Sequence, residues 1–337
     1  MNDWLLGQLV CPRDTSPLDL RDERLTCRHG HVYPVVDGCP ILLIDDVEPT
    51  HGYIRDTLAT VAALGTARQP PTPVVAPADS GGVDAFVQDE IVRTSGNLYT
   101  ALKGRLPRYP IPTSRLPEGR GQRLLDIGCN WGRWSVAAGR RGYRVVGIDP
   151  SLGAVMAARR VTRQLGVEAL FVVGDARFLP FADDTFDSVF SYGVFQHFSK
   201  DNARQSFCQI RRVLRHGHTA WLQMPNRYGI RQYYQHWRRG FTPGEGFDVR
   251  YWTPSELRQT FEDLLGPTHM TVDGFFGLGI QASDLDLLPW HSRAVVHASE
   301  LLRRVSHRWP ALTQVADSLY LEAVNDKTRV PQSTPWP

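Results

Sequence analysis

The sequence predicts an α/β protein with a seven-stranded, mostly parallel sheet covered by helices on both faces, preceded by a small β-rich module. From about residue 121, apolar runs typical of buried strands alternate with runs of helical periodicity. Such alternation is the pattern of a parallel sheet with crossover helices. Short apolar runs separated by turn residues fill the first 45 positions. The predicted strands are 123–128, 143–149, 169–174, 186–192, 219–225, 270–276 and 319–324, and the predicted helices are 132–141, 151–165, 201–214 and 253–265.

The first predicted strand of this sheet ends in a turn built to receive a ligand. Residues 128–132 read Gly-Cys-Asn-Trp-Gly and lead directly into a helical pattern. Gly128 and Gly132 lack a Cβ, so a ligand can approach the backbone closely, and Asn130 tolerates positive φ better than most residues. Asp126 stands just before the turn, where its charge would repel a pyrophosphate. We therefore expect a ligand with a cationic group near Asp126.

Two more predicted strands also end in an aspartate. Asp149 follows the strand that comes next, 23 positions after Asp126, where a carboxylate can accept both hydroxyls of a ribose. Asp175 follows the third strand, and its acceptor oxygens suit the exocyclic amine of an adenine. Together, the three strand ends predict contacts for an amino acid, a ribose and a purine.

With these motifs the chain resembles the class I S-adenosylmethionine-dependent methyltransferases, in Asp126–Gly132, Asp149, Gly174-Asp175-Ala176 and the following Phe186–Gly193. Asn130 stands where the family more often has glycine. The resemblance implies a Rossmann-like fold and S-adenosyl-L-methionine as cofactor. The candidate cofactor-binding residues are Asp126, Gly128, Cys129, Asn130, Gly132, Asp149, Pro150, Ser151, Asp175, Ala176, Ser191 and Tyr99.

The methyl acceptor should meet the cofactor at the end of the fourth strand, in Ser191–His197. A base is needed only for a protonated acceptor such as a hydroxyl, and His197 is the first candidate, with Tyr192 and His236 as rivals. Alternatively, His197 caps a helix or only lines the pocket. The segment lacks the Asn-Pro-Pro-Tyr motif of family members that methylate exocyclic amines, which favours a hydroxyl of a small-molecule or carbohydrate-like acceptor.

Residues 1–45 resemble a small zinc-ribbon module. Cys11-Pro-Arg-Asp14 would be the first knuckle, with Asp14 in place of the second cysteine, and Cys27-Arg-His-Gly-His31 the second. A site formed by Cys11, Asp14, Cys27 and His31 is chemically possible, but structural zinc sites strongly favour thiolate and imidazole. The sequence therefore favours a metal-free module, in which Asp14 caps a turn.

The remaining boundaries follow from composition and periodicity. Residues 46–118 form a predicted linker with lid-type helices, because 66–82 are rich in proline and glycine and 83–105 show helical spacing. In the resemblance, such helices fold over the cofactor, which makes Arg93, Asn97 and Tyr99 candidate contacts; a docking helix is the alternative. Residues 119–325 form the predicted methyltransferase domain and 326–337 a frayed tail.

Residues 227–252 form a predicted insertion rich in arginine and aromatic residues, against only Glu245 and Asp248 as acids. It could grip a phosphorylated sugar, a nucleotide-linked glycan, a nucleic acid or an anionic membrane surface. In the alternative, its aromatic residues are the buried stripe of a covering helix and its arginines the solvated face. The aromatic residues in question are Tyr233, Tyr234, Trp237 and Phe241, and the arginines are Arg231, Arg238 and Arg239.

Overall composition adds little to these motifs. A net charge of +3 makes a nucleic-acid partner less favoured, and five cysteines are too few for a disulfide framework. Because the first residues lack a secretory pattern and no apolar run would cross a bilayer, we expect a cytoplasmic protein. Two alternatives stay open: an RNA methyltransferase, and a non-catalytic protein that keeps the cofactor fold to hold a partner.

Overall fold

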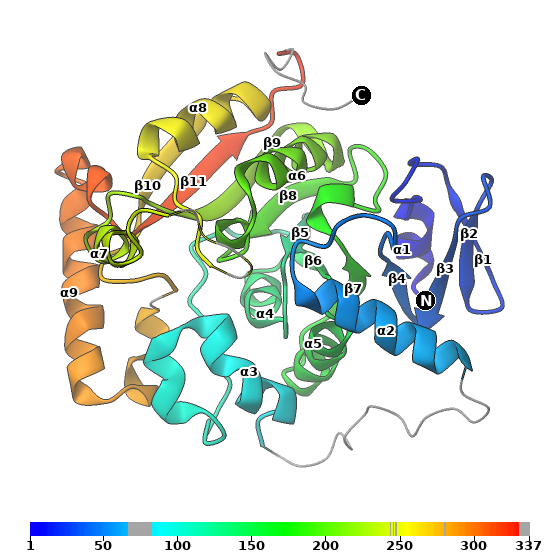
Figure 1. Ribbon diagram of the computed structural model, residues 1–337, viewed down its shortest axis with the longest axis horizontal. Helices are drawn as coiled ribbons and strands as arrows, with labels where there is room; N and C mark the ends of the chain where they lie inside the picture. Colours follow the sequence, from blue (N-terminus) through cyan, green and yellow to red (C-terminus); the bar gives the residue numbers. More distant parts are fainter. Residues whose placement is uncertain (67–81, 243, 245, 247, 280, 330–337) are drawn as a thin grey trace.

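The computed structural model describes residues 1–66, 82–242, 244, 246, 248–279 and 281–329, and has one sheet at its centre (Figure 1). Residues 67–81, which make up most of the proline- and glycine-rich stretch, and residues 330–337 of the predicted tail lie outside the described residues. The strands are β1 (Leu18–Arg21), β2 (Arg24–Cys27), β3 (Val32–Val36), β4 (Cys39–Leu42), β5 (Arg123–Ile127), β6 (Arg144–Asp149), β7 (Ala169–Gly174), β8 (Phe186–Ser191), β9 (Leu214–Pro225), β10 (Thr268–Gly274) and β11 (Ser318–Val324).

The α-helices connect and cover these strands, and short 3-10 segments join several of them. The helices are α1 (Asp3–Gln8), α2 (Gly52–Thr66), α3 (Ala85–Ser95), α4 (Arg133–Arg140), α5 (Leu152–Gln164), α6 (Lys200–Val213), α7 (Ile230–Arg238), α8 (Pro254–Leu264) and α9 (Trp290–Ser306). The 3-10 segments are η1 (Asn97–Leu102), η2 (Ala176–Phe178), η3 (Phe195–His197), η4 (Ala282–Leu287) and η5 (Pro310–Gln314). In the part of the chain that the structure describes, no helix is both long and apolar enough to cross a membrane.

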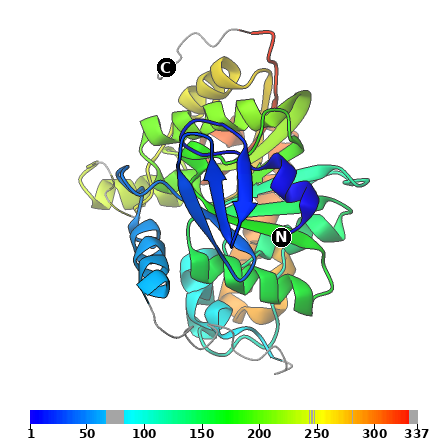
Figure 2. The same cartoon turned by 90° about the vertical axis from the view of Figure 1, so that its right-hand side faces the viewer.

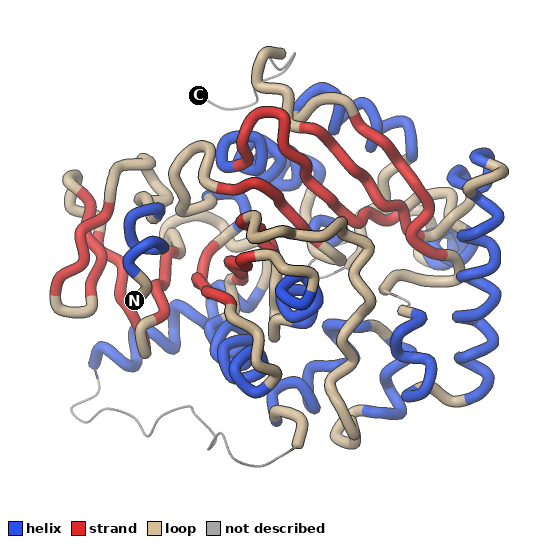
Figure 3. The backbone as a smooth tube through the Cα atoms, turned by 180° about the vertical axis from the view of Figure 1, so that it is seen from behind, coloured by secondary structure: helices blue, strands red, loops and turns tan. Residues whose placement is uncertain are grey.

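Seven strands follow the order β7-β6-β5-β8-β9-β11-β10. All neighbours from β7 to β9 are parallel, and β11 runs antiparallel to both β9 and β10. The strands are drawn in red in Figure 3, with helices in blue around them. The predicted seven-stranded, mostly parallel sheet is therefore confirmed. In this register Ile127 lies beside both Ile148 and Ser191, so β5, β6 and β8 end at the same edge.

The two faces of the sheet bury different helices. Leu125 and Ile127 share a core cluster with Phe207 of α6, whereas Leu124 packs in a cluster with Ala138 of α4. Since alternate side chains of a strand point to opposite faces, α4 and α6 cover opposite faces. β5 is accordingly buried at four of its five positions, as expected for a strand covered on both sides.

The N-terminal strands extend the same sheet. β1 to β4 pair antiparallel in chain order, and β4 then pairs parallel with β7, with Ile41 beside Val173 and Leu42 beside Gly174 (Figure 2). Leu42 also belongs to the core cluster that contains Val172 of β7. The sequence did not predict this junction, which joins the N-terminal module to β7, the strand that Asp175 follows.

A buried charged network holds the segment after α3 against α4. Arg133 Nη2 lies 2.5 Å from Asp284 Oδ2, and the Tyr99 hydroxyl donates to the same carboxylate. All three side chains are buried, and burial raises the pKa of Tyr99 above its usual range. Removing one partner of such a buried pair typically costs about 3–5 kcal/mol. The network therefore fixes η1 and η4 beside the cavity described below.

Candidate functional site

A cavity of about 910 Å³ lies at the carboxyl edge of β5, β6, β7 and β8. Its wall is formed by the ends of these strands, by the end of α3 and the segment after it, and by the residues at the start of α2. Helix α7 and the segment that follows α7 also contribute to the wall. Of the residues predicted from the sequence, it is lined by Gly128, Asn130, Asp149, Pro150, Asp175, Ala176, Tyr192 and His197, together with Arg93 and Asn97.

The turn after β5 has the backbone that its residue types require. Gly128, Asn130 and Gly132 have φ values of 72°, 44° and 83°. A Cβ on Gly128 would lie 2.2 Å from Val194 Cγ2, and one on Gly132 would lie 3.2 Å from the Cβ of Ala158. Gly128 is thus needed where the turn approaches the chain after β8, and Gly132 where α4 meets α5.

Asp149 closes the end of β6 with both carboxylate oxygens held by backbone. Its Oδ2 accepts from the Asn130 N–H at 3.0 Å, and its Oδ1 accepts from the Ser151 N–H at 2.9 Å. Burial nevertheless raises the pKa of this carboxyl to about 6. Asp149 therefore links the first turn to the second and presents the remaining acceptor capacity to the cavity.

The charge of Asp175 is balanced by Arg177, two residues later in the chain. The Arg177 guanidinium lies 2.7 Å from Asp175 Oδ2 and also donates to the carbonyl of Glu48 at 2.9 Å. Both charged side chains are buried. The pair therefore holds the segment after β4 beside the C-terminal end of β7.

Several residues predicted as cofactor contacts do not line the cavity, and their role as contacts stays a prediction. Asp126 is buried in the sheet and accepts from Ser135 Oγ at 2.6 Å, and burial raises its pKa to about 7. Ser151 caps α5 through Ala154 N–H, and the Ser191 hydroxyl donates to the Ile127 carbonyl. Cys129 and Gly132 face neighbouring core residues, and Tyr99 joins the Arg133–Asp284 network.

Tyr192 forms a wall at the acceptor end. Its hydroxyl donates to Asp273 Oδ2 at 2.7 Å and accepts from Gln281 Nε2 at 2.9 Å. Burial, reinforced by the nearby Asp273 charge, raises the pKa of Tyr192 well above its usual range. The phenol therefore stays protonated near neutral pH, which argues against a role as general base.

His197 lies in η3 and lines the cavity. Its Nε2 is 3.0 Å from Gln196 Nε2. Because an amide nitrogen donates and does not accept, His197 Nε2 is the acceptor of this contact and carries a lone pair. Gln196 Oε1 is buried and has no hydrogen-bond partner among the residues that the structure describes. Rotation of the amide would place this oxygen against an imidazolium N–H, so Gln196 can support the ring in either protonation state.

His236, the other candidate base, lies on the inner side of α7 and does not line the cavity. Its ring packs against Tyr251, with centroids 5.0 Å apart. Burial, with Arg227 and Arg239 nearby, lowers its pKa. Of the two histidines proposed from the sequence, His197 is therefore the one that lines the cavity.

Other cavity residues had no recognisable pattern in the sequence. Thr50, His51 and Tyr53 come from the start of α2, where burial lowers the pKa of His51. Residues 277–279 contribute a glycine-containing loop from the far end of the sheet. These segments reach the cavity only through tertiary packing, which no local spacing encodes.

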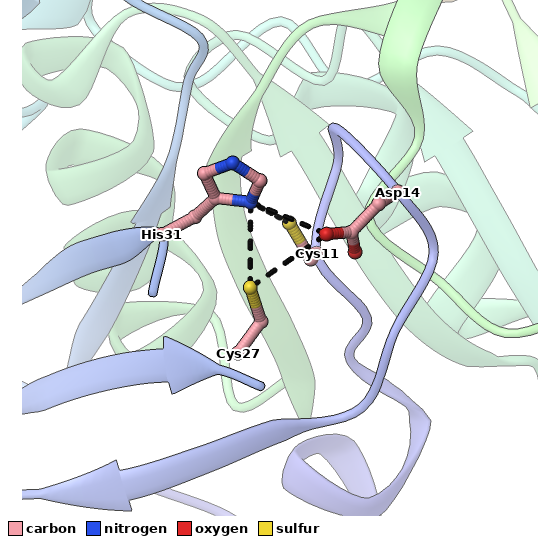
Figure 4. A group of neighbouring side chains, drawn as sticks. All are labelled: Cys11, Asp14, Cys27 and His31. Carbon is pink, nitrogen blue, oxygen red and sulfur yellow. Dashed lines mark hydrogen bonds and ion pairs between the residues drawn. The ribbon is translucent and has the colours of Figure 1, made fainter. Parts of the chain in front are cut away.

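A second cluster of chemically reactive side chains lies in the N-terminal module (Figure 4). Cys11, Asp14, Cys27 and His31 each offer one ligand atom, and all four atoms lie within 4.8 Å of one another. His31 Nδ1 is 3.4 Å from Cys11 Sγ, 3.3 Å from Cys27 Sγ and 3.3 Å from Asp14 Oδ2. Hydrogen bonds from Ser16 hold the pKa of Asp14 well below its usual range.

Comparison with known proteins places the central part of this chain in one family. A family model described as "Methyltransferase domain" matches residues 124–217. Residues 124–217 form a methyltransferase domain. They belong to the S-adenosylmethionine-dependent class, and S-adenosylmethionine is the cofactor of that class.

Among curated relatives, a probable fatty acid methyltransferase of Mycobacterium tuberculosis is 31% identical over 33% of this chain and 26% of its own length. A ubiquinone biosynthesis O-methyltransferase of Azorhizobium caulinodans is 32% identical over 33% of this chain and 39% of its own. The chain thus spans less than half the length of either relative. A solved methyltransferase structure from Methanosarcina mazei is 17% identical, with a TM-score of 0.45, covering 63% of this chain and 95% of that one.

Proposed function

We propose that this protein transfers a methyl group from S-adenosylmethionine to a hydroxyl of a small-molecule acceptor. One observation carries the proposal: a single cavity is lined by the ends of three parallel strands and by His197. Relatives named as O-methyltransferases, in ubiquinone biosynthesis and elsewhere, support the acceptor class. A carbohydrate-like acceptor falls within the same chemistry.

Each part of the cofactor has a matching feature in the cavity wall. The bare backbone of the turn at Gly128 suits the amino-acid portion. Asp149 suits the ribose hydroxyls, and the edge formed by Asp175 and Ala176 suits the purine. Asp126 supports the turn indirectly, because its carboxylate accepts a hydrogen bond from Ser135 at the start of α4.

The chemistry needs alignment and one proton acceptor. S-adenosylmethionine, when bound, would supply a methyl group activated on a sulfonium, and the cavity wall would align the acceptor hydroxyl with that methyl carbon. The hydroxyl proton would pass to His197 Nε2 once the Gln196 amide has turned its nitrogen away from that atom. In that orientation Gln196 Oε1 would accept a hydrogen bond from the imidazolium N–H.

The two alternative functions, an RNA methyltransferase and a non-catalytic binding protein, require different features of this cavity. An RNA methyltransferase would need a path for a nucleic acid to reach His197, and a non-catalytic protein would need the cofactor only as a structural element. Buried Asp149 and its two backbone hydrogen bonds support a maintained cofactor site. Measuring S-adenosylhomocysteine production with phenols, sugars, lipids and RNA as acceptors would distinguish these functions.

Asp149→Ala should weaken S-adenosylmethionine binding by about tenfold to a hundredfold, because a hydrogen bond to a charged group contributes about 1.5–3 kcal/mol. Titration calorimetry measures this directly. Because the carboxylate binds in its ionised form and its pKa is raised to about 6, wild-type affinity should fall as the pH is lowered through that value. Asp149→Asn should bind weakly at every pH.

The matched control is Asp286→Ala, which removes an exposed carboxylate paired with Arg108. It should bind the cofactor as the wild type does. Equal affinity of Asp149→Ala and wild type would place the ribose elsewhere, and tighter binding of NADH than of the methyl donor would overturn our interpretation of the turn.

His197→Ala should lower turnover by about 100-fold or more while leaving cofactor affinity nearly unchanged, because a positioned base contributes on that order. Turnover of the wild type should rise with pH, since only neutral imidazole accepts a proton, and the variant should lose this dependence. Steady-state kinetics with the best acceptor measures both effects.

His291→Ala, at an exposed position of α9, is the control and should leave turnover unchanged. Loss of cofactor binding together with activity in His197→Ala would instead make His197 a pocket-lining residue.

We also propose that Cys11, Asp14, Cys27 and His31 bind one zinc ion, although the sequence favours a metal-free module. Ligands about 2.0–2.3 Å from a tetrahedral zinc lie roughly 3.3–3.8 Å from one another. The distances of 3.3 and 3.4 Å around His31 Nδ1, and 3.8 Å between Cys27 and Asp14, fall in this range. The low pKa of Asp14 keeps its carboxylate ionised for ligation.

Elemental analysis of protein purified from zinc-containing medium should find about one zinc per chain, since four ligands complete a structural site. Cys27→Ser should lose the metal and melt at a lower temperature, because bound metal stabilises only the folded state. Cys208→Ser, outside the cluster, should keep it. Well below one zinc in the wild type would support the metal-free module.

A further inference from the structure

Helix α7 exposes its apolar stripe and buries polar residues. Ile230, Tyr233, Tyr234 and Trp237 occupy positions i, i+3, i+4 and i+7, which form one face of a helix. All four are about half exposed, with Trp237 at 58%. The buried residues of α7 are Gln232 and His236. This arrangement is the reverse of a surface helix and contradicts the interpretation in which the aromatic residues are the buried stripe.

The orientation of α7 is fixed by its contacts. Asp317 Oδ1 accepts from the backbone N–H groups of Arg231 and Gln232 at 2.7 and 2.9 Å, which anchors the first turn. Gln232 Oε1 accepts from the Tyr251 hydroxyl at 3.2 Å. A Cβ on Gly229 would lie 2.4 Å from the Cα of Asp317, so the helix starts in close contact with the sheet. The outward face is therefore held in place by the fold.

More exposed apolar side chains lie next to this stripe. The Ile230 N–H donates to the carbonyl of Val315, which is itself 40% exposed. Trp309, just before η5, is 68% exposed. In Figure 1, α7 and α9 lie on the same side of the molecule. The stripe is thus part of a wider apolar and aromatic surface.

The charge of these segments has one sign. Residues 227–242 contain four arginines, Arg227, Arg231, Arg238 and Arg239, and no acidic residue. Residues 301–316 contain Arg303, Arg304 and Arg308, again with no acidic residue. The Arg238 guanidinium lies 5.9 Å from the Tyr234 ring centroid, beside the stripe. Arg239 and Arg303 are ion-paired with Asp248 and Glu300, and the other arginines give the surface its positive charge, so it complements a negatively charged partner.

We propose that the outer face of α7 docks on an anionic lipid surface. Tyr and Trp favour the boundary between headgroups and acyl chains, because one end of each side chain is apolar and the other polar. Arg238, whose guanidinium lies beside the stripe, can pair with a lipid phosphate at the same depth. Single-stranded nucleic acid is less well matched, because Ile230 and Val315 offer no ring on which a base can stack.

Docking in this way would bring the cavity to the lipid surface. Arg231, Gln232, Gln235 and Arg239 of α7 and its C-terminal end line the cavity, while the aromatic stripe of the same helix faces outward. An acceptor that partitions into the lipid, with its hydroxyl near the headgroups, would then enter beside α7. This acceptor class rests on the proposed methyl transfer; the docking itself does not.

Vesicle co-sedimentation without cofactor or acceptor tests the docking. The full chain should bind phosphatidylcholine vesicles that contain phosphatidylglycerol and bind pure phosphatidylcholine weakly, with added salt reducing the difference. Tyr234→Ala combined with Trp237→Ala should reduce binding by about tenfold or more, because it removes two interfacial aromatic side chains. Both residues are exposed, so the melting temperature should stay close to that of the wild type.

Trp290→Ala is the matched control, because Trp290 is 80% exposed at the opposite end of α9 from residue 306. It should bind vesicles as the wild type does. Equal binding of the double variant and the wild type, or no binding to anionic vesicles, would overturn the proposal. If the double variant keeps vesicle binding but loses binding to single-stranded RNA, the partner is RNA and the proposal is wrong. If it keeps vesicle binding but loses self-association, the partner is a second copy of this chain and the proposal is likewise wrong. Vesicle binding without methyl transfer would refute only the proposed function.

Discussion

Parallel hydrogen bonding of β5 with β6 on one side and β8 on the other is the constraint on which the site depends. Parallel strands end at a common edge, and here the register sets Ile127 beside both Ile148 and Ser191. The residues that follow these strands are then neighbours although they are far apart in sequence. Asp149 joins two of the strand ends through the Asn130 N–H, so the sheet positions the cavity wall directly.

The N-terminal module is joined to the same edge. β4 pairs with β7, and the chain that leaves β4 is tied by Arg177 through the Glu48 carbonyl before it reaches His51 in the cavity wall. Arg13, which lies between the metal-ligand candidates Cys11 and Asp14, also holds Asp45 and Asp46. These contacts connect the N-terminal module to the wall of the cavity.

Sequence patterns predicted the features that are local or strictly periodic. The strand ends at Gly128, Asp149 and Asp175 could be recognised because the three motifs occur together in order and spacing, and the strands themselves by their apolar runs. Side-chain direction could not be predicted: Asp126 and Tyr99 turn away from the cavity into buried hydrogen bonds. The outward stripe of α7 was equally hidden, because periodicity gives a face but not the side on which the sheet lies.

Hydrogen–deuterium exchange with and without S-adenosylhomocysteine tests the central claim most directly, since it reports on the backbone at each strand end. The account predicts that the ligand slows exchange in residues 128–132, 149–152 and 174–178, together with the segment around His51. It predicts no comparable protection in the N-terminal strands β1 and β2, which lie at the far edge of the sheet. Protection confined to other segments, or the same pattern produced by NADH, would contradict it.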